Sequence, residues 1–82
     1  MKLLLSNSAQ KDLDKLSDDI TLKISKKLYD LAFNPYMYGS EKLSGNKGYR
    51  IRIGDYRVVY TIDKISKTII IVKVKHRKEV YR

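Results

Sequence analysis

Few side chains in this sequence are suited to chemistry, and most of them stand in its second half. The 82 residues include no cysteine, one histidine (His76) and five arginines, all of which follow position 49. Without thiolates and with a single imidazole, the chain lacks the ligands of a zinc or iron centre, so we expect neither a metal nor another cofactor. It has no carboxylate dyad, nucleophile elbow or glycine-rich phosphate loop. Any catalysis would therefore use cations, one imidazole and a phenol.

Three arginines stand in the segment GYRIRIGDYRVVY, in which polar and apolar residues alternate. Gly54 and Asp55 at its centre match the two-residue loop that closes a β-hairpin. In that register Arg52 lies opposite Arg57, and Arg50 projects from the same face about 7 Å from Arg52. Like charges that face each other destabilise a sheet by up to about 1 kcal/mol, so we interpret this crowding as functional.

A face that carries Arg50, Arg52 and Arg57 has the chemistry of a phosphodiester-binding site. A guanidinium keeps its charge and can hold a phosphate through two parallel hydrogen bonds. An acidic protein would suit the same face, and these residues leave the choice between the two partners open. A third interpretation is that an acidic residue of the chain itself, Glu41, Asp55 or Glu79, pairs with the arginines.

The tail KHRKEVYR adds a histidine, a further arginine and a tyrosine after the last apolar strand residue. His76 could act as a general acid or base, because imidazole exchanges protons near neutral pH. A lone histidine at a strand end is more often a half-buried polar residue, and both interpretations stand. Tyr81 could stack on a base or pack over the edge of a sheet.

The first half of the chain predicts one strand and two helices. Residues 2–5 match a short strand, and two amphipathic helices follow, which start at serine caps and end before Pro35. The first helix can be capped by Ser6 or Ser8, and the second by Ser17. Apolar residues recur at helical spacing at Ala9, Leu13, Leu16, Ile20, Ile24, Leu28 and Leu31. A helical hairpin with such an apolar stripe needs a sheet to cover.

From Tyr49 onward the apolar period changes from helical to alternating, which predicts antiparallel strands. The last strand, from Thr68 to about His76, is rich in isoleucine and valine and should lie near the centre of the sheet. Strict alternation places Lys73, Lys75 and Arg77 on the arginine-bearing face, and Ile70, Val72, Val74 and His76 on the other. The predicted fold class is α+β. Residues 1–82 form one domain with the order β-α-α-β-β-β: a short strand, a helical hairpin and a three-stranded antiparallel meander, with the helices covering one face.

The charge of the chain is unevenly distributed. The formal net charge is +9, of which residues 1–40 carry +1 (six basic, five acidic) and residues 41–82 carry +8 (twelve basic, four acidic). Such an excess indicates a polyanionic partner: nucleic acid, an acidic protein or an anionic membrane surface. The amino terminus, MKLLLSNSAQ, has too short an apolar run for a signal peptide or a membrane span, so we expect a cytoplasmic protein. Of the three polyanions, we expect nucleic acid or an acidic protein as the partner and not a membrane.

Several stretches together resemble the RelE and ParE superfamily, the toxins of bacterial and archaeal toxin–antitoxin pairs. The matching stretches are SNSAQKDLDKL, FNP, EKLSGNKGYRIRIGDYRVVYTID and VKVKHRKEVYR. The resemblance covers nearly the whole chain. It implies the β-α-α-β-β-β fold described above, and RNA binding on the concave sheet face opposite the helices in the ribonuclease branch.

In the RelE branch the resemblance implies an mRNA interferase that works in the ribosomal A site. Such an endoribonuclease uses the RNA 2′-hydroxyl as nucleophile and needs no metal. The residues implied are Arg57, Arg77, Tyr81 and His76 as catalytic, and Arg50, Arg52, Lys73 and Lys75 as RNA-binding. Arg57 and Arg77 would contact the phosphate. Tyr81 would stack on a base or orient the RNA, and His76 would carry a proton in the reaction. Relatives often have lysines where Arg50 and Arg52 stand, and an arginine cannot act as a base.

Two other functions stay open. A ParE-like toxin would inhibit DNA gyrase, and a catalytically weak toxin would act mainly with its antitoxin as a transcriptional repressor. The retention of Arg57, Arg77 and Tyr81 favours the ribonuclease. In each case the resemblance implies a small, acidic, RelB-like antitoxin that orders on binding. The ribosomal A site and mRNA would be further partners, and operator DNA would be bound only through the antitoxin complex.

Overall fold

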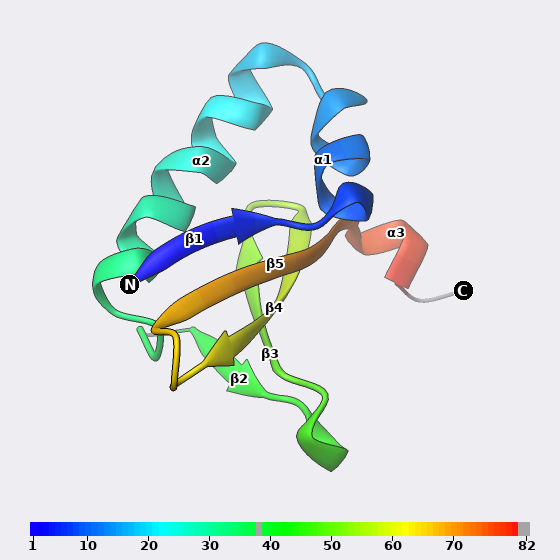
Figure 1. Cartoon of the computed structure of the whole chain (residues 1–82). Coiled ribbons are helices and arrows are strands. Elements are labelled where there is room, and N and C mark those ends of the chain that lie inside the picture. Colours follow the sequence, from blue (N-terminus) through cyan, green and yellow to red (C-terminus); the bar gives the residue numbers. More distant parts are fainter. Residues whose placement is uncertain (38, 81–82) are drawn as a thin grey trace.

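The elements of the chain form a sheet with two helices on one side (Figure 1). The computed structural model describes residues 1–37 and 39–80. In chain order the elements are β1 (Lys2–Leu5), α1 (Asn7–Asp14), α2 (Asp18–Phe33), β2 (Ser40–Lys42), a 3-10 turn (Ser44–Asn46), β3 (Tyr49–Ile53), β4 (Tyr56–Asp63), β5 (Thr68–His76) and α3 (Arg77–Val80).

The five strands lie in the order β1-β5-β4-β3-β2. Strand β1 runs parallel to β5, and all other pairs are antiparallel. The predicted α+β class, with its helical hairpin and antiparallel meander, is confirmed. The structure adds the edge strand β2, which the sequence analysis missed because three residues are too few to show a period of two.

The helices begin and end where the sequence predicts. The Ser6 hydroxyl accepts a hydrogen bond from the Ala9 amide at 3.0 Å and caps α1, and Ser17 caps α2 through the Ile20 amide at 3.4 Å. Both caps satisfy amides that have no partner inside the first turn. Helix α2 stops at Asn34, whose backbone leaves the helical region before Pro35.

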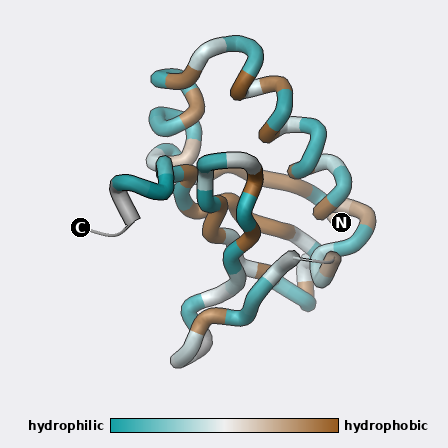
Figure 2. Tube along the Cα trace, turned by 180° about the vertical axis from the view of Figure 1, so that it is seen from behind, coloured by the Kyte–Doolittle hydropathy of each residue, from teal (hydrophilic) through white to brown (hydrophobic). Residues whose placement is uncertain are grey.

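The core lies between the helices and one face of the sheet. The buried apolar residues are Ala9, Leu13, Ile24, Leu28, Leu31, Ile51, Ile53, Val58, Tyr60, Ile69, Ile71 and Val74. In Figure 2 the hydrophobic segments concentrate at the middle of the molecule, while the helices alternate between hydrophilic and hydrophobic residues. This alternation is the amphipathic pattern that the helical spacing predicts.

Tyr60 anchors the loop after α2 to the middle of the sheet. Its side chain is fully buried, and its hydroxyl donates a hydrogen bond to the Pro35 carbonyl at 2.8 Å. Burial raises the pKa of the Tyr60 phenol, because the charged phenolate is poorly solvated there. Its ring stacks on Tyr49 across β3 and β4, as the predicted hairpin register requires.

A β-bulge interrupts the alternation of β5. Val59 pairs with Lys73, whereas the next residue of β4, Tyr60, pairs with Ile71. Val72 is therefore an extra residue without a partner in the register. A bulge of this kind reverses the faces of the residues on either side of it.

The bulge overturns one prediction about β5. Strict alternation placed Ile70, Val72 and Val74 on one face, and this is wrong. Ile71 and Val74 are both buried against the helices although they are three residues apart, whereas Ile70 pairs with Thr61 on the opposite face. A single inserted residue explains the odd spacing.

Candidate functional site

The arginine hairpin has the predicted register. Arg52 pairs with Arg57, and Arg50 pairs with Val59, on the face away from the helices. The two-residue turn includes Gly54 with a positive φ of 59°, a conformation that glycine adopts without strain. The register follows from this tight turn, so it could be predicted from local sequence.

The start of α3 brings a further arginine to this hairpin. The Arg77 amide donates a hydrogen bond to the Asp55 carbonyl at 2.8 Å, which ties the end of β5 to the β3–β4 turn. A pocket beside this bond is lined by Arg52, Asp55, Tyr56, Arg57 and Arg77. Three arginines from β3, β4 and α3 therefore meet in one place, on the face where alternation placed them.

A second hollow continues toward β2. Its lining residues are Gly39, Glu41, Arg50, Ile51, Arg52 and Arg57. Because both hollows share Arg52 and Arg57, we call them together the arginine groove, with Arg50, Arg52, Arg57 and Arg77 as its defining residues. Arginines spaced along one groove suit the repeated phosphates of a nucleic acid strand.

An acidic residue of the chain already holds one arginine of the groove. Strand β2 places Glu41 opposite Arg50, and Glu41 Oε2 accepts from Arg50 Nε at 3.0 Å and from Nη2 at 2.8 Å. The interpretation that Glu41 pairs with an arginine is thus confirmed. Both side chains are well exposed, at 40% for Arg50 and 63% for Glu41, so a polyanion can compete for Arg50.

His76 lies at the end of β5 on the face toward the helices, as the sequence placed it. It pairs with Tyr56, and the two rings meet edge to face with their centroids 5.1 Å apart. Its Nδ1 accepts a hydrogen bond from the Lys78 amide at 3.2 Å. A neutral imidazole that accepts at Nδ1 carries its hydrogen on Nε2, so the side chain is oriented as a hydrogen-bond donor.

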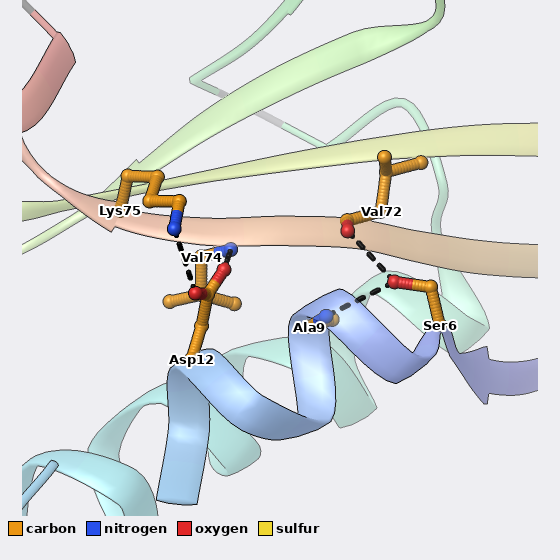
Figure 3. Close-up of polar contacts among 6 residues, drawn as sticks. All are labelled: Ser6, Ala9, Asp12, Val72, Val74 and Lys75. Carbon is orange, nitrogen blue, oxygen red and sulfur yellow. Dashed lines mark hydrogen bonds and ion pairs between the residues drawn. The ribbon is translucent and has the colours of Figure 1, made fainter. Parts of the chain in front are cut away.

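The two lysines of β5 return to the groove's face after the bulge. Lys73 pairs with Val59 and is exposed, and Lys75 pairs with Arg57. The Lys75 ammonium nevertheless reaches Asp12 on α1, with its Nζ 2.8 Å from Oδ1 (Figure 3). Of the two lysines predicted to bind RNA, Lys75 is therefore engaged by a carboxylate of the chain itself.

Asp12 is a site residue that the sequence analysis missed. It is only 7% exposed, and its Oδ2 accepts a hydrogen bond from the Val74 amide at 2.9 Å. Burial alone would raise the pKa of Asp12, but hydrogen bonds from Lys75 and Val74, with the charges of Lys75 and Lys15, outweigh burial and lower it. An aspartate on a short amphipathic helix gives no sign of a partner more than sixty positions away.

Tyr81, the remaining predicted site residue, lies outside the described residues. Within residues 1–37 and 39–80, no three histidine or acidic side chains gather as metal ligands would. In the same part of the chain no helix is both long and apolar enough to cross a membrane.

Comparison with known proteins identifies the family. The family model described as "ParE toxin of type II toxin-antitoxin system" matches residues 3–81. Toxin RelG of Mycobacterium tuberculosis is 32% identical over 81 residues, which cover 94% of this chain and 91% of that protein.

Solved structures share the fold over almost the whole chain. The toxin–antitoxin complex RelBE2 from Mycobacterium tuberculosis matches with a TM-score of 0.83 at 28% identity, covering 93% of this chain and 96% of that chain. The isolated Escherichia coli RelE toxin matches with a TM-score of 0.80 at 27% identity, covering 98% of this chain and 89% of that chain. The archaeal RelE–RelB complex from Pyrococcus horikoshii matches with a TM-score of 0.79 at 28% identity, covering 93% of each chain. This chain therefore belongs to the RelE/ParE superfamily and is a toxin of a type II toxin–antitoxin system.

Proposed function

We propose that the arginine groove binds messenger RNA and that the toxin is a ribosome-dependent, metal-independent endoribonuclease acting in the cytoplasm. The observation that carries this proposal is the pocket in which Arg52, Arg57 and Arg77 meet, on the sheet face that the helices leave open. The similarity to RelE toxins over more than nine tenths of the chain supports it.

The reaction is attack of the RNA 2′-hydroxyl on the adjacent phosphodiester. The O–P bond that forms closes a 2′,3′-cyclic phosphate, and the bond that breaks releases the 5′-oxygen of the next nucleotide. Solvent water takes the proton of the 2′-hydroxyl, and the 5′-oxygen gains a proton and leaves as a hydroxyl. Arg57 and Arg77 stabilise the charge that gathers on the phosphate oxygens in the transition state. Arg50, Arg52 and Lys73 orient the strand, Lys75 adds positive charge at the edge, and Tyr81 stacks on or orients a base.

His76 is the proposed proton donor to the leaving 5′-oxygen. Because β5 turns this residue to the face toward the helices, the RNA must pass the end of β5 beside Arg77 to reach it. Only the imidazolium form can donate a proton, so Nδ1, which accepts from the Lys78 amide in this structure, must take up a hydrogen and release that contact, and Nε2 is then the donor. Because Arg50 and Arg52 cannot give up a proton, neither removes the proton of the 2′-hydroxyl. The proposal thus separates charge stabilisation, which the arginines provide, from proton transfer, which they do not.

Translating ribosomes with added toxin test this function directly. Primer extension on the messenger should show discrete cuts, and Arg77→Ala should reduce their rate by about 100-fold or more, as removal of a group that stabilises transition-state charge does. Lys26→Ala is the matched control, because it removes one positive charge from the exposed surface of α2. A messenger left intact by the wild-type toxin would rule the ribonuclease out.

The second candidate is a DNA gyrase inhibitor, which the match to the ParE toxin family model over residues 3–81 favours. A supercoiling assay separates it from the ribonuclease. Inhibited supercoiling together with an intact messenger would establish the ParE-like function. If neither activity appears, the remaining candidate is a weak toxin that works with its antitoxin as a repressor on operator DNA.

The proposed partner is a small, acidic, RelB-like antitoxin. Similar toxins from Mycobacterium tuberculosis and Pyrococcus horikoshii were solved as toxin–antitoxin complexes. The net charge of +9 complements an acidic protein. A short acidic reading frame next to that of the toxin, whose product co-purifies with it, is the expected finding.

A further inference from the structure

Strand β5 loses its neighbour on one edge before it reaches the arginine groove. Strand β1 pairs with β5 only from Lys2 opposite Thr68 to Leu5 opposite Ile71, whereas β5 continues to His76. Backbone groups along the rest of that edge need other partners, because a buried amide or carbonyl without one is costly. Helix α1 lies along this part of β5, where β1 has ended (Figures 1 and 3).

Two residues of this segment, Ser6 and Asp12, take the place of the missing strand. The Ser6 amide donates to the Ile71 carbonyl at 2.9 Å, and the Ser6 hydroxyl donates to the Val72 carbonyl at 2.7 Å. Further along α1, Asp12 accepts from the Val74 amide at 2.9 Å (Figure 3). Ser6 and Asp12 therefore continue the hydrogen bonding of β1 along β5.

These hydrogen bonds flank the bulge. Val72, which Ser6 holds, is the extra residue, and Val74, which Asp12 holds, is the first buried residue after it. Without the bulge, the two-residue period from the buried Ile71 would turn Lys73 and Lys75 toward the helices and the core. With the bulge, both lysines lie on the face of the arginine groove.

We propose that Ser6 and Asp12 are positioning residues that hold the bulge at Val72 and thereby set the face on which Lys73 and Lys75 emerge. The register of β5 is independent of any ligand. Its consequence for RNA binding rests on the function proposed above.

The chemistry of the two residues fits this role. The Ser6 hydroxyl uses its donor toward Val72 and an acceptor toward the Ala9 amide, so one side chain joins the start of α1 to the bulge. Asp12 uses one oxygen for the Val74 amide and the other for the Lys75 ammonium. Because Lys75 follows Val74 directly, this carboxylate binds the backbone and the side chain of β5 at once.

The register is tested by nuclear magnetic resonance on Ser6→Ala and Asp12→Ala, each in the full chain. In Asp12→Ala we expect the Val74 amide to exchange with solvent about tenfold faster, the factor that one ordinary hydrogen bond contributes. In the doubly substituted chain, the cross-strand neighbour of Val59 should change from Lys73 to Val72. Ser6→Thr should restore the wild-type pattern, because threonine keeps the hydroxyl.

Ser17→Ala is the control, because Ser17 caps a helix in the same way without touching β5. It should lower stability and leave Lys73 as the cross-strand neighbour of Val59. If the doubly substituted chain keeps the wild-type pairing, the bulge does not depend on these residues and the inference is overturned. If Asp12→Ala does not fold, Asp12→Leu replaces it, because leucine has a similar size and no acceptor for the Val74 amide; the same change in pairing is expected.

A binding measurement with a single-stranded RNA oligonucleotide gives the functional consequence. The slope of log affinity against log salt should fall by about 0.7 for each phosphate that the lysines no longer neutralise once they turn away. A change in stability with an unchanged slope and an unchanged pairing of Val59 would show a structural role only. If the wild-type toxin binds no RNA, the proposed function fails, while the resonance experiment still decides the register.

Discussion

At the scale of single residues, the arginines of the groove differ in what already holds them. Arg50 is paired with Glu41, while Arg52 Nε donates to the Gly54 carbonyl at 3.2 Å. The Arg77 amide is bonded to Asp55 at the hairpin turn. Glu41 therefore both orients Arg50 and competes with any anion that approaches it.

We expect Glu41→Gln to bind single-stranded RNA several-fold more tightly, because Arg50 is then held less strongly and the groove loses a negative charge. The free energy of unfolding should change by less than about 1 kcal/mol, since the pair is exposed. Fluorescence anisotropy at two salt concentrations measures the affinity. Asp63→Asn, which makes the same charge change at the far end of β4, is the control, and equal gains in both variants would contradict a specific role for Glu41.

At the scale of elements, the close approach of two strands places a limit on the loop before β3. Gly48 has φ of 105°, and a Cβ there would lie 2.5 Å from the Tyr60 carbonyl oxygen. Gly39 has a similar φ of 95°, but a Cβ there would meet nothing within 4 Å. The two glycines share a positive φ and differ in how closely they approach β4.

This difference makes a matched pair of substitutions. Both Gly48→Ala and Gly39→Ala should destabilise the toxin, because alanine is strained at positive φ. Gly48→Ala should cost roughly 2 kcal/mol more, since β3 or β4 must also move to admit the methyl group. Urea unfolding of the two variants measures the difference. Equal losses in the free energy of unfolding would contradict the expectation, because they would show that β3 and β4 move apart without destabilising the fold.

At the scale of the whole molecule, shifted pKa values of Asp12, Asp63 and Tyr60 affect the pH range of stability. The pKa of Asp12 is lowered for the reasons given above, and hydrogen bonds from Ser66 and the Ile65 amide lower the pKa of Asp63. Burial raises the pKa of Tyr60. A carboxyl group whose pKa is lowered by folding stabilises the protein at pH values above its unfolded pKa, and this stability is lost as the pH falls through the folded pKa. A phenol whose pKa is raised by folding stabilises the protein at pH values below its unfolded pKa, and this stability is lost as the pH rises through the folded pKa.

The free energy of unfolding should therefore be highest between about pH 4 and about pH 10, the unfolded values of these groups, and fall on both sides. Tyr60→Phe should lower stability near neutral pH, because the bond to Pro35 is removed, yet flatten the alkaline decline. Asp12→Asn should flatten the acid decline. Urea titrations across this range measure both, and a Tyr60→Phe chain that declines as steeply as wild type would contradict the assignment to this phenol.

Local signals account for the parts of the fold that could be predicted from sequence. Serine caps defined the starts of both helices, and Gly54 with Asp55 defined the register that brings Arg52 opposite Arg57. These features depend on residues a few positions apart, whose geometry follows from backbone sterics and hydrogen bonding. The family resemblance added the roles of Arg57, Arg77, Tyr81 and His76, and those roles stay predictions.

The sequence by itself thus determined an α+β domain with an arginine-bearing hairpin and a strongly basic second half. Only the tertiary structure decided that β2 places Glu41 on Arg50, that β5 bulges at Val72, and that Asp12 holds Val74 and Lys75. The physical reason is distance along the chain. Asp12 and Val74 are 62 positions apart, and nothing in the local sequence of either residue specifies the other until packing of α1 against β5 brings them together.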